Sequence, residues 1–210
     1  MIINLRGPSG SGKSYIGHKF IDTFGNDVEE LYEDGWNKTK PKLVGYRLPG
    51  DLYIAGPYRA AGGGADLLAP HDRSRTVDLV ERLSERGHVF IEALFASSTI
   101  KPYMELAGRV GTDLVFAFLD TPYELCHDRV LMRNGGRPIN EDAHRGHHRF
   151  VARSAQRFID GGFHVEYIDH TRAFEQVWEL LLSGGWAPHF YDRFFSPMPG
   201  EDGRVVVTGI

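Results

Sequence analysis

The segment that most constrains how this chain can fold is a glycine-rich octapeptide, GPSGSGKS, at positions 7–14. It fits the pattern G-x-x-x-x-G-K-[ST], follows the apolar run Ile2–Leu5 and precedes a helical pattern over Lys13–Phe24. Glycines let a chain curl so that successive N–H groups point inward, and the start of a helix adds partial positive charge there. The order strand, loop, helix therefore predicts a phosphate-binding loop.

We expect this loop to hold the phosphates of ATP together with Mg²⁺. Lys13 can reach the β- and γ-phosphates, and the Ser14 hydroxyl can ligate the metal ion. A glycine-rich turn that merely caps a helix is the alternative interpretation, and the strand and helix on either side argue against it. The residues predicted to bind the nucleotide are Gly7, Ser9, Gly10, Ser11, Gly12, Lys13 and Ser14.

Apolar runs alternate with helical patterns along the rest of the chain. Strands are predicted at 52–58, 88–95, 113–119 and 164–168, and helices at 71–86, 122–132, 143–159 and 174–182. Such alternation over one domain's length predicts an α/β fold with a doubly wound, mostly parallel sheet flanked by helices. The polar stretch 26–49 resists assignment, and we expect loop there with a short strand around 43–48.

Length and composition indicate one globular domain. With 210 residues and a net charge of −4, the chain is not a strongly basic, histone-like protein. We expect a main domain over 1–185 and an aromatic extension over 186–210 that packs on or near its core. Cys126 is the sole cysteine, so no intrachain disulfide is expected. No signal peptide and no membrane-spanning run is predicted, so we expect a cytoplasmic protein without a membrane partner.

Two carboxylates are candidates for catalysis. Glu92 closes an apolar strand, where it is predicted to act on the Mg²⁺ side, and a polar residue that simply ends a strand is the alternative. Asp66 lies just beyond a second glycine loop and is predicted to accept the proton of an attacking hydroxyl, whereas capping of the next helix or turn is the alternative. The predicted substrate-binding residues nearby are Tyr58, Arg59, Gly63 and Gly64.

The segment FLDTPYELCHDRVLMR, at positions 118–133, resembles the fourth strand and the arginine-bearing helix and lid of P-loop kinases that phosphorylate nucleosides, nucleotides and other small hydroxyl compounds. In that family lid arginines close on the transferring phosphate and exclude water. The resemblance implies this role for Arg129, Arg133 and Arg137, in a lid over roughly 129–150, and a solvated arginine face is the alternative. The chain lacks the Asn-Lys-x-Asp motif of GTPases.

Over roughly residues 1–170 the combination of INLRGPSGSGKS, YIAGPYRAAGGGADLL and VFIEALFASS resembles small bacteriophage P-loop kinases. Members of that set phosphorylate 5-hydroxymethyluracil bases within DNA during thymine hypermodification. The resemblance implies an alcohol-group phosphotransferase that acts on a modified pyrimidine in DNA, in the host cytoplasm, as part of restriction evasion. A base in a duplex must be extruded first, and stacking by Tyr58, Trp36 or Tyr103 would support it.

A further pattern is an arginine at every fourth position of one predicted helix: Arg145, Arg149, Arg153 and Arg157. No acidic residue occurs between positions 143 and 159, so the ridge suits a polyanion, either a triphosphate or a DNA backbone. A solvated face paired with acids elsewhere is the alternative. The nearby residues His144, His147 and His148 lack further ligands at zinc spacing.

Two other functions stay open from the residues alone. One is a kinase of a free nucleoside, nucleotide or other small alcohol, which would use the same nucleotide site. The other is a nucleotide-binding regulatory module without catalysis, in which Lys13 would matter and the carboxylates Asp66 and Glu92 would not.

Overall fold

The computed structural model describes residues 1–36, 40–59, 63–68, 73–92 and 99–188, with the short strands at 198–199 and 205–206. The strands of the main sheet are β1 Ile2–Arg6, β2 Glu29–Glu33, β3 Lys42–Leu48, β4 Leu52–Ala55, β5 His88–Glu92, β6 Leu114–Asp120 and β7 His164–Asp169. The helices are α1 Lys13–Phe24, α2 Arg73–Ser84, α4 Lys101–Val110, α5 Tyr123–Arg133, α6 Glu141–Asp160 and α7 Ala173–Ser183. Short 3₁₀ turns are η1 Gly25–Asp27, η2 Ala65–Leu67 and η3 Gly111–Asp113.

The main sheet has seven strands in the order β2-β3-β4-β5-β1-β6-β7. The strands from β4 to β7 in this order run parallel, whereas β2 and β3 form an antiparallel edge. The prediction of a doubly wound, mostly parallel sheet is therefore confirmed. The sequence analysis assigned neither β2, within the polar stretch, nor α4. In the C-terminal extension, β8 Met198–Pro199 pairs antiparallel with β9 Val205–Val206, and the rest of 189–210 lies outside the described residues.

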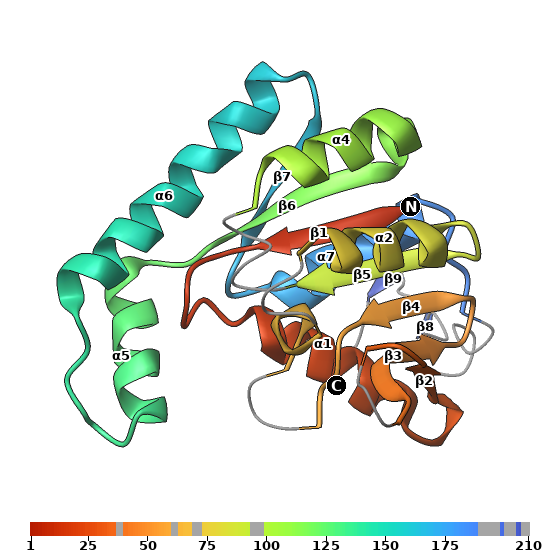
Figure 1. Ribbon diagram of the computed structural model, residues 1–210, viewed down its shortest axis with the longest axis horizontal. Coiled ribbons are helices and arrows are strands. Elements are labelled where there is room, and N and C mark those ends of the chain that lie inside the picture. Colours follow the sequence, from red (N-terminus) through yellow and green to blue (C-terminus); the bar gives the residue numbers. More distant parts are fainter. Residues whose placement is uncertain are drawn as a thin grey trace.

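Helices cover both faces of the sheet (Figure 1). Successive residues of β1 point to opposite faces, so that Ile2 joins one buried cluster and Ile3 the other. Helices α2, α4 and α6 contribute to the first cluster, and α1 and α7 to the second. Trp186, at the start of the aromatic extension, is buried and packs against Trp178 with ring centroids 4.7 Å apart.

Strand order places a crevice at the carboxyl end of β1. The chain passes from β1 to β4 and β5 on one side and then returns to β6 and β7 on the other. Ligands of such sheets bind where the order reverses, beyond the carboxyl ends of the strands. Helices α5 and α6 pack together and extend past this edge of the sheet (Figure 1). In the described part of the chain no helix combines the length and apolarity needed to cross a membrane.

Candidate active site

The glycine-rich loop connects β1 to α1 and adopts backbone conformations that require glycine. Gly10 has φ 82° and Gly12 has φ 105°, both in the left-handed region. A Cβ atom on Gly10 would lie 2.2 Å from the carbonyl oxygen of Cys126, so α5 packs directly on the loop. Lys13 is buried, and its Nζ donates hydrogen bonds to the carbonyl oxygens of Gly7 at 2.8 Å and Pro8 at 3.0 Å.

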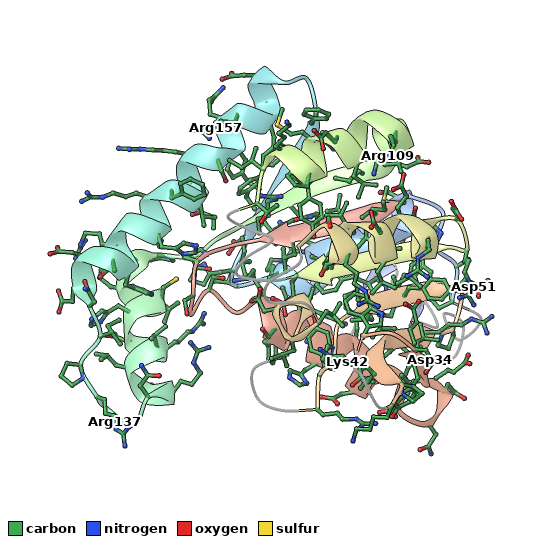
Figure 2. All side chains as sticks on the ribbon, in the orientation of Figure 1. Asp34, Lys42, Asp51, Arg109, Arg137 and Arg157 are labelled. Atoms are coloured by element: carbon green, nitrogen blue, oxygen red, sulfur yellow. The ribbon has the colours of Figure 1, made fainter. Side chains whose placement is uncertain are left out.

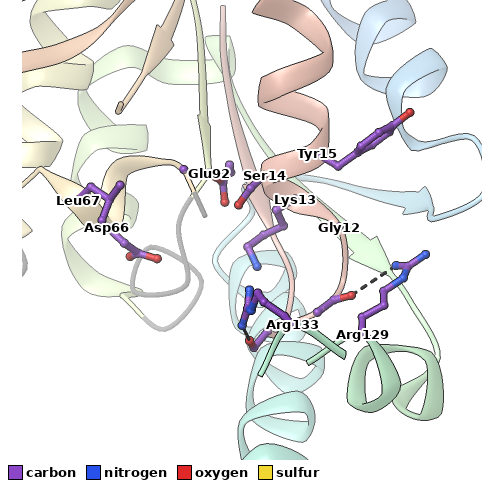
Figure 3. Close-up of a pocket in the computed structure, with 12 residues that line it drawn as sticks. Gly12, Lys13, Ser14, Tyr15, Asp66, Leu67, Glu92, Arg129 and Arg133 are labelled. Carbon is purple, nitrogen blue, oxygen red and sulfur yellow. Dashed lines mark hydrogen bonds between the residues drawn. The ribbon is translucent and has the colours of Figure 1, made fainter. Parts of the chain in front are cut away.

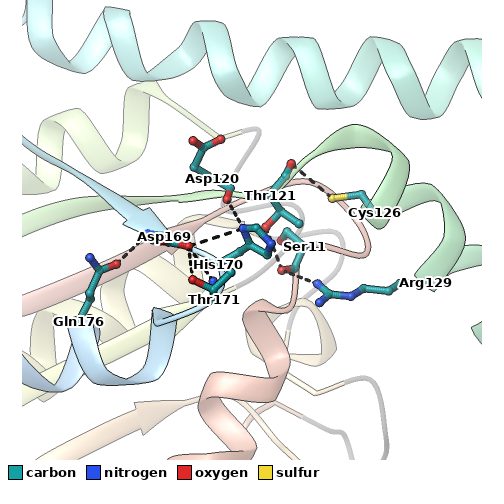
Figure 4. Close-up of polar contacts among 9 residues, drawn as sticks. All are labelled: Ser11, Asp120, Thr121, Cys126, Arg129, Asp169, His170, Thr171 and Gln176. Carbon is teal, nitrogen blue, oxygen red and sulfur yellow. Dashed lines mark hydrogen bonds and ion pairs between the residues drawn. The ribbon is translucent and has the colours of Figure 1, made fainter.

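Side chains from the β6–α5 turn and α5 fix the outer side of this loop. The Thr121 hydroxyl donates to the carbonyl oxygen of Ser11 at 3.1 Å. Arg129 donates through Nη1 to the carbonyl oxygens of Gly10 at 3.3 Å and Ser11 at 3.2 Å, as Figure 4 shows for the Ser11 contact. These bonds occupy carbonyl oxygens on the back of the loop, which leaves the guanidinium of Arg129 at the edge of the crevice.

Helix α6 adds two histidines to the same support. His144 Nε2 lies 3.2 Å from the carbonyl oxygen of Ser9, and His148 Nε2 lies 3.0 Å from that of Thr121. Arg133 of α5 donates from Nη2 to the Ser9 hydroxyl at 3.1 Å. The position of α5 and α6 is therefore coupled to the conformation of the loop, which the spacing of these residues in the sequence did not reveal.

Glu92 ends β5 opposite Lys13 and is 1% exposed. Its Oε1 accepts a hydrogen bond from the Tyr58 hydroxyl at 3.1 Å, and its carboxyl group is also hydrogen-bonded to Ser14. Burial raises the pKa of Glu92 to about 7, although the charge of Lys13 and these hydrogen bonds favour the ionised form. The group therefore titrates near neutral pH, the range in which a carboxylate can exchange a proton or bind a cation.

A cavity of about 410 Å³ brings the predicted catalytic residues together (Figure 3). Five of the six predicted catalytic side chains line it, namely Lys13, Asp66, Glu92, Arg129 and Arg133. Cations from the loop and α5 thus face carboxylates from β5 and η2 across one space. Arg137 does not line this cavity and lies exposed at the tip of the α5–α6 connection (Figure 2).

Tyr58 does not offer a ring face to a ligand. It is 5% exposed, and a Cβ atom on Gly17 or Gly63 would lie 2.3 Å or 2.4 Å from its ring. In this structure the ring of Tyr58 is enclosed and its hydroxyl is bonded to Glu92, so it presents no face for the stacking that the sequence predicts. Tyr103 is 2% exposed, which also excludes it as a stacking surface in this conformation. Trp36 does not line the cavity and packs under the guanidinium of Arg75.

The other three predicted substrate-binding residues differ in whether they lie at the cavity. Gly63 lines the cavity, and Gly64 borders the carboxylate, because a Cβ atom on Gly64 would lie 2.2 Å from Glu92 Oε1. Arg59, by contrast, is exposed and donates to both carboxylate oxygens of Glu30, at 3.2 Å and 2.7 Å. The sequence predicts that Arg59 binds a substrate phosphate. In this structure its guanidinium is paired with Glu30 and does not line the cavity.

A second cavity, of about 420 Å³, adjoins the loop on the other side of Arg129. Apolar side chains such as Ile16 and Phe174 line it together with the polar residues His170 and Thr171. His170 Nδ1 lies 3.0 Å from the carbonyl oxygen of Asp120 (Figure 4), so this nitrogen donates the hydrogen bond and the ring is held beside the cavity. This second cavity was not predicted from the sequence, in which its signal is a polar turn after the last parallel strand.

The oxygens at the first cavity suit Mg²⁺. The Ser14 hydroxyl and the Glu92 carboxylate are hydrogen-bonded to each other, so they can serve one ion, and both are the hard donors that Mg²⁺ prefers. Among the described residues no group of three or more His, Cys, Asp or Glu side chains could hold a metal ion. Mg²⁺ is usually held through one or two protein ligands together with phosphate oxygens, and the Ser14–Glu92 pair fits that mode.

Comparison with known proteins identifies relatives over most of the chain. The family model for 5-hmdU DNA kinase matches residues 59–162. A 5-hmdU DNA kinase of Pseudomonas phage M6 is 32% identical over 191 residues, which cover 87% of this chain and 98% of that protein. A 5-hmdU DNA kinase of Pseudomonas phage PaMx11 is 30% identical over 190 residues, covering 86% and 96%.

Among solved structures, a gluconokinase from Sinorhizobium meliloti 1021 has a TM-score of 0.47 at 16% identity and covers 87% of this chain and 89% of its own. A shikimate kinase from Acinetobacter baumannii has a TM-score of 0.45 at 17% identity and covers 89% and 95%. The resemblance to phage kinases that the sequence segments predicted is confirmed by the phage relatives. The chain belongs to the 5-hmdU DNA kinase family.

Proposed function

We propose that this protein transfers the γ-phosphoryl group of ATP to the hydroxymethyl group of 5-hydroxymethyluracil in phage DNA, in the cytoplasm of the infected host. One observation carries the proposal: in a member of this family, a phosphate-binding loop with Lys13 faces the carboxylates Glu92 and Asp66 across one cavity. The loop supplies donor binding, and the opposite wall supplies groups that can handle the acceptor hydroxyl.

On the donor side, we assign the triphosphate to the loop and to Lys13, Arg129 and Arg133. These three cations would neutralise the charge that builds up on the transferring group, and they are held by hydrogen bonds to the loop itself. The second cavity is apolar along one wall and polar along the other, which suits the nucleoside of ATP. Ser14 and Glu92 would hold Mg²⁺, which when bound neutralises phosphate charge.

On the acceptor side, we assign the role of general base to Asp66. The carboxylate lines the cavity from η2, opposite Lys13. The hydroxymethyl proton would pass to Asp66 while the hydroxyl oxygen forms its bond to the γ-phosphorus and the bond to the β-phosphate oxygen breaks. The buried Glu92 would stay on the metal side, because Tyr58 and Ser14 already bind its oxygens.

The proposal is tested by offering three acceptors with γ-labelled ATP and Mg²⁺. They are an oligonucleotide with one 5-hydroxymethyluracil, the same oligonucleotide with thymine, and the free 5-hydroxymethyluracil nucleoside. We expect label on the first only. Label confined to the nucleoside would show instead a kinase of small alcohols, and no label on any acceptor despite ATP binding would indicate a non-catalytic module.

A pH dependence follows from Glu92. Its carboxyl group is neutral below and ionised above a pKa of about 7, and binding of Mg²⁺ needs the ionised form. At limiting Mg²⁺, kcat/KM is therefore expected to fall as the pH drops below about 7. In Tyr58→Phe the carboxylate loses a hydrogen bond that lowers its pKa, so the acid limb of the profile should move to higher pH.

Tyr46→Phe is the matched control for that measurement. The Tyr46 hydroxyl is close by, but it accepts its hydrogen bond from the backbone N–H of Tyr58, at 3.1 Å, and not from Glu92. Its removal should leave the acid limb in place. A limb that stays fixed in Tyr58→Phe, or that moves equally in both variants, would contradict the assignment of the limb to Glu92.

A further inference from the structure

Helix α6 has two faces with different surroundings. Its inner face packs into the core through Val151, Ala155 and Phe158, which are all buried. His144 and His148, near the start of the helix, reach the loop and the turn after β6. Positions four apart on a helix advance only about 40° around its axis, so the four arginines follow one outer side. Arg145, Arg149, Arg153 and Arg157 are all exposed.

The last three of these arginines, Arg149, Arg153 and Arg157, make no side-chain salt bridge or hydrogen bond with any residue that the structure describes, and we call them the α6 ridge. Arg145 differs, because its guanidinium lies 3.9 Å from the centre of the Tyr123 ring. Five other exposed arginines in the described chain pair with carboxylates, namely Arg47, Arg59, Arg82, Arg109 and Arg172. The exposed Arg86, Arg133 and Arg137 do not pair with the carboxylate of any described residue. The α6 ridge thus gathers, on one side of one helix, three exposed arginines without a hydrogen-bond or ion-pair partner among the described residues.

Stability of the helix does not explain the ridge. Like charges four residues apart on a helix repel each other, and α6 places three in succession. The acids of α6 lie only at its ends. Glu141 and Asp142 are in the first turn, where they favour the helix dipole, and Asp160 accepts a hydrogen bond from Gln156 at 2.7 Å. The sequence between these ends therefore keeps positive charge unbalanced on an outer face.

We propose that the α6 ridge binds the phosphate backbone of DNA beside the nucleotide that enters the cavity. This rests on the proposed function. The eight residue steps from Arg149 to Arg157 span about 12 Å at ~1.5 Å each. That length corresponds to roughly three to four nucleotide steps of ~3.4 Å along one strand. The three arginines are opposite in charge to a nucleic-acid backbone, and the row that they form is as long as three to four of its nucleotide steps.

The position of the ridge discriminates between polyanions. His144 and His148 of α6 contact the loop and the turn after β6, whereas the ridge lies on the opposite side of the same helix. A triphosphate bound at the loop cannot reach that side, and a free nucleoside carries no backbone to extend there. DNA can occupy the cavity with one nucleotide and continue over α5 and α6 with its neighbours. The ridge therefore gives a physical basis for a preference for polymer over free nucleoside.

The test compares two triple variants with the same change in charge. One is Arg149→Gln/Arg153→Gln/Arg157→Gln, and the control is Arg47→Gln/Arg82→Gln/Arg109→Gln, which removes exposed arginines that have carboxylate partners. The affinity for a 5-hydroxymethyluracil duplex much longer than the ridge is measured by fluorescence anisotropy over a range of salt concentrations. Thermal unfolding verifies that both variants are folded.

We expect the ridge variant to lose at least about tenfold in affinity, and the slope of log K against log salt to become shallower by about 2.7, because each phosphate contact contributes about 0.9. The control should keep the wild-type slope. On the shortest oligonucleotide that the wild type phosphorylates, kcat of the ridge variant should equal that of the wild type.

Two results would overturn the ridge proposal, and a third concerns the function instead. A wild-type slope in the ridge variant, or an equal loss in the control, would show that DNA does not use this face. If the wild-type enzyme labels the free nucleoside and binds no DNA, the result contradicts the proposed function itself. The binding assay and the labelling assay therefore separate the two failures.

Discussion

Replacing Lys13 with alanine is expected to lower the rate of phosphoryl transfer by about 10³-fold. Lys13 lies buried between the loop and the two carboxylates of the cavity, and its Nζ is fixed by the carbonyl oxygens of Gly7 and Pro8. In water, solvent would screen the attraction between this cation and the transferring phosphate. In the enclosed site the ammonium group is already in place when charge develops on the phosphate, so no solvent has to reorganise. Single-turnover labelling of 5-hydroxymethyluracil DNA at saturating ATP measures the effect.

Lys101→Ala is the control, because that side chain is 87% exposed at the start of α4 and, among the described residues, pairs only with Glu105. It should retain wild-type activity. Lys13→Ala has a second expected consequence: the charge of Lys13 favours ionised Glu92, so its loss raises the pKa of Glu92 further. A near-normal single-turnover rate in Lys13→Ala would contradict the assignment of this cavity to phosphoryl transfer.

Gly64→Ala is expected to reduce kcat by about 100-fold, because small displacements of positioned groups cost that much. Gly64 has φ 102°, and an added Cβ would lie 2.2 Å from Glu92 Oε1 and 2.9 Å from its carboxyl carbon. The methyl group must therefore push the carboxylate away from Ser14 and Tyr58, or shift η2 and with it Asp66. The measurement is kcat together with the Mg²⁺ concentration at half-maximal activity, which should rise.

Gly136→Ala separates this effect from backbone strain. Gly136 also has a left-handed φ, 78°, but an added Cβ meets nothing within 4 Å. Both substitutions also strain the backbone, by about 1–3 kcal/mol, and the strain is greater at Gly64 because its ψ of −178° lies in a region that only glycine adopts readily. Only Gly64→Ala should lose activity beyond what its thermal unfolding accounts for. Equal kinetic losses in the two variants would mean that contact with Glu92 is not the cause.

Local sequence determined the nucleotide loop, most of the strand and helix order, and the position of Glu92 at the end of a buried strand. These features depend on neighbours in the chain: glycines at left-handed positions, apolar runs long enough for a strand, and helical spacing after the loop. Parallel pairing then follows, because helices between strands require crossovers, and the carboxyl ends of β1 and β5 meet at one edge. That juxtaposition brings Lys13 and Glu92 to one cavity.

Elements at the periphery were harder to predict. Strand β2 is mostly exposed and carries Glu29, Glu30 and Glu33, so it has little apolar pattern and is held by pairing with β3. In α4 only three residues are buried, namely Tyr103, Leu106 and Ala107, and the helix is short. Both elements are fixed mainly by contacts with distant parts of the chain, which local pattern does not contain.

Only the tertiary structure decided which side of the fold each polar side chain meets. Tyr58 and Arg59 are adjacent in sequence, yet Tyr58 turns inward to Glu92 and Arg59 outward to Glu30. Arg133 reaches Ser9, whereas Arg137 lies past the end of α5, where the chain no longer points at the cavity. The chain specifies which groups are available through local chemistry, but burial, pairing and orientation depend on residues tens of positions away that fold against them.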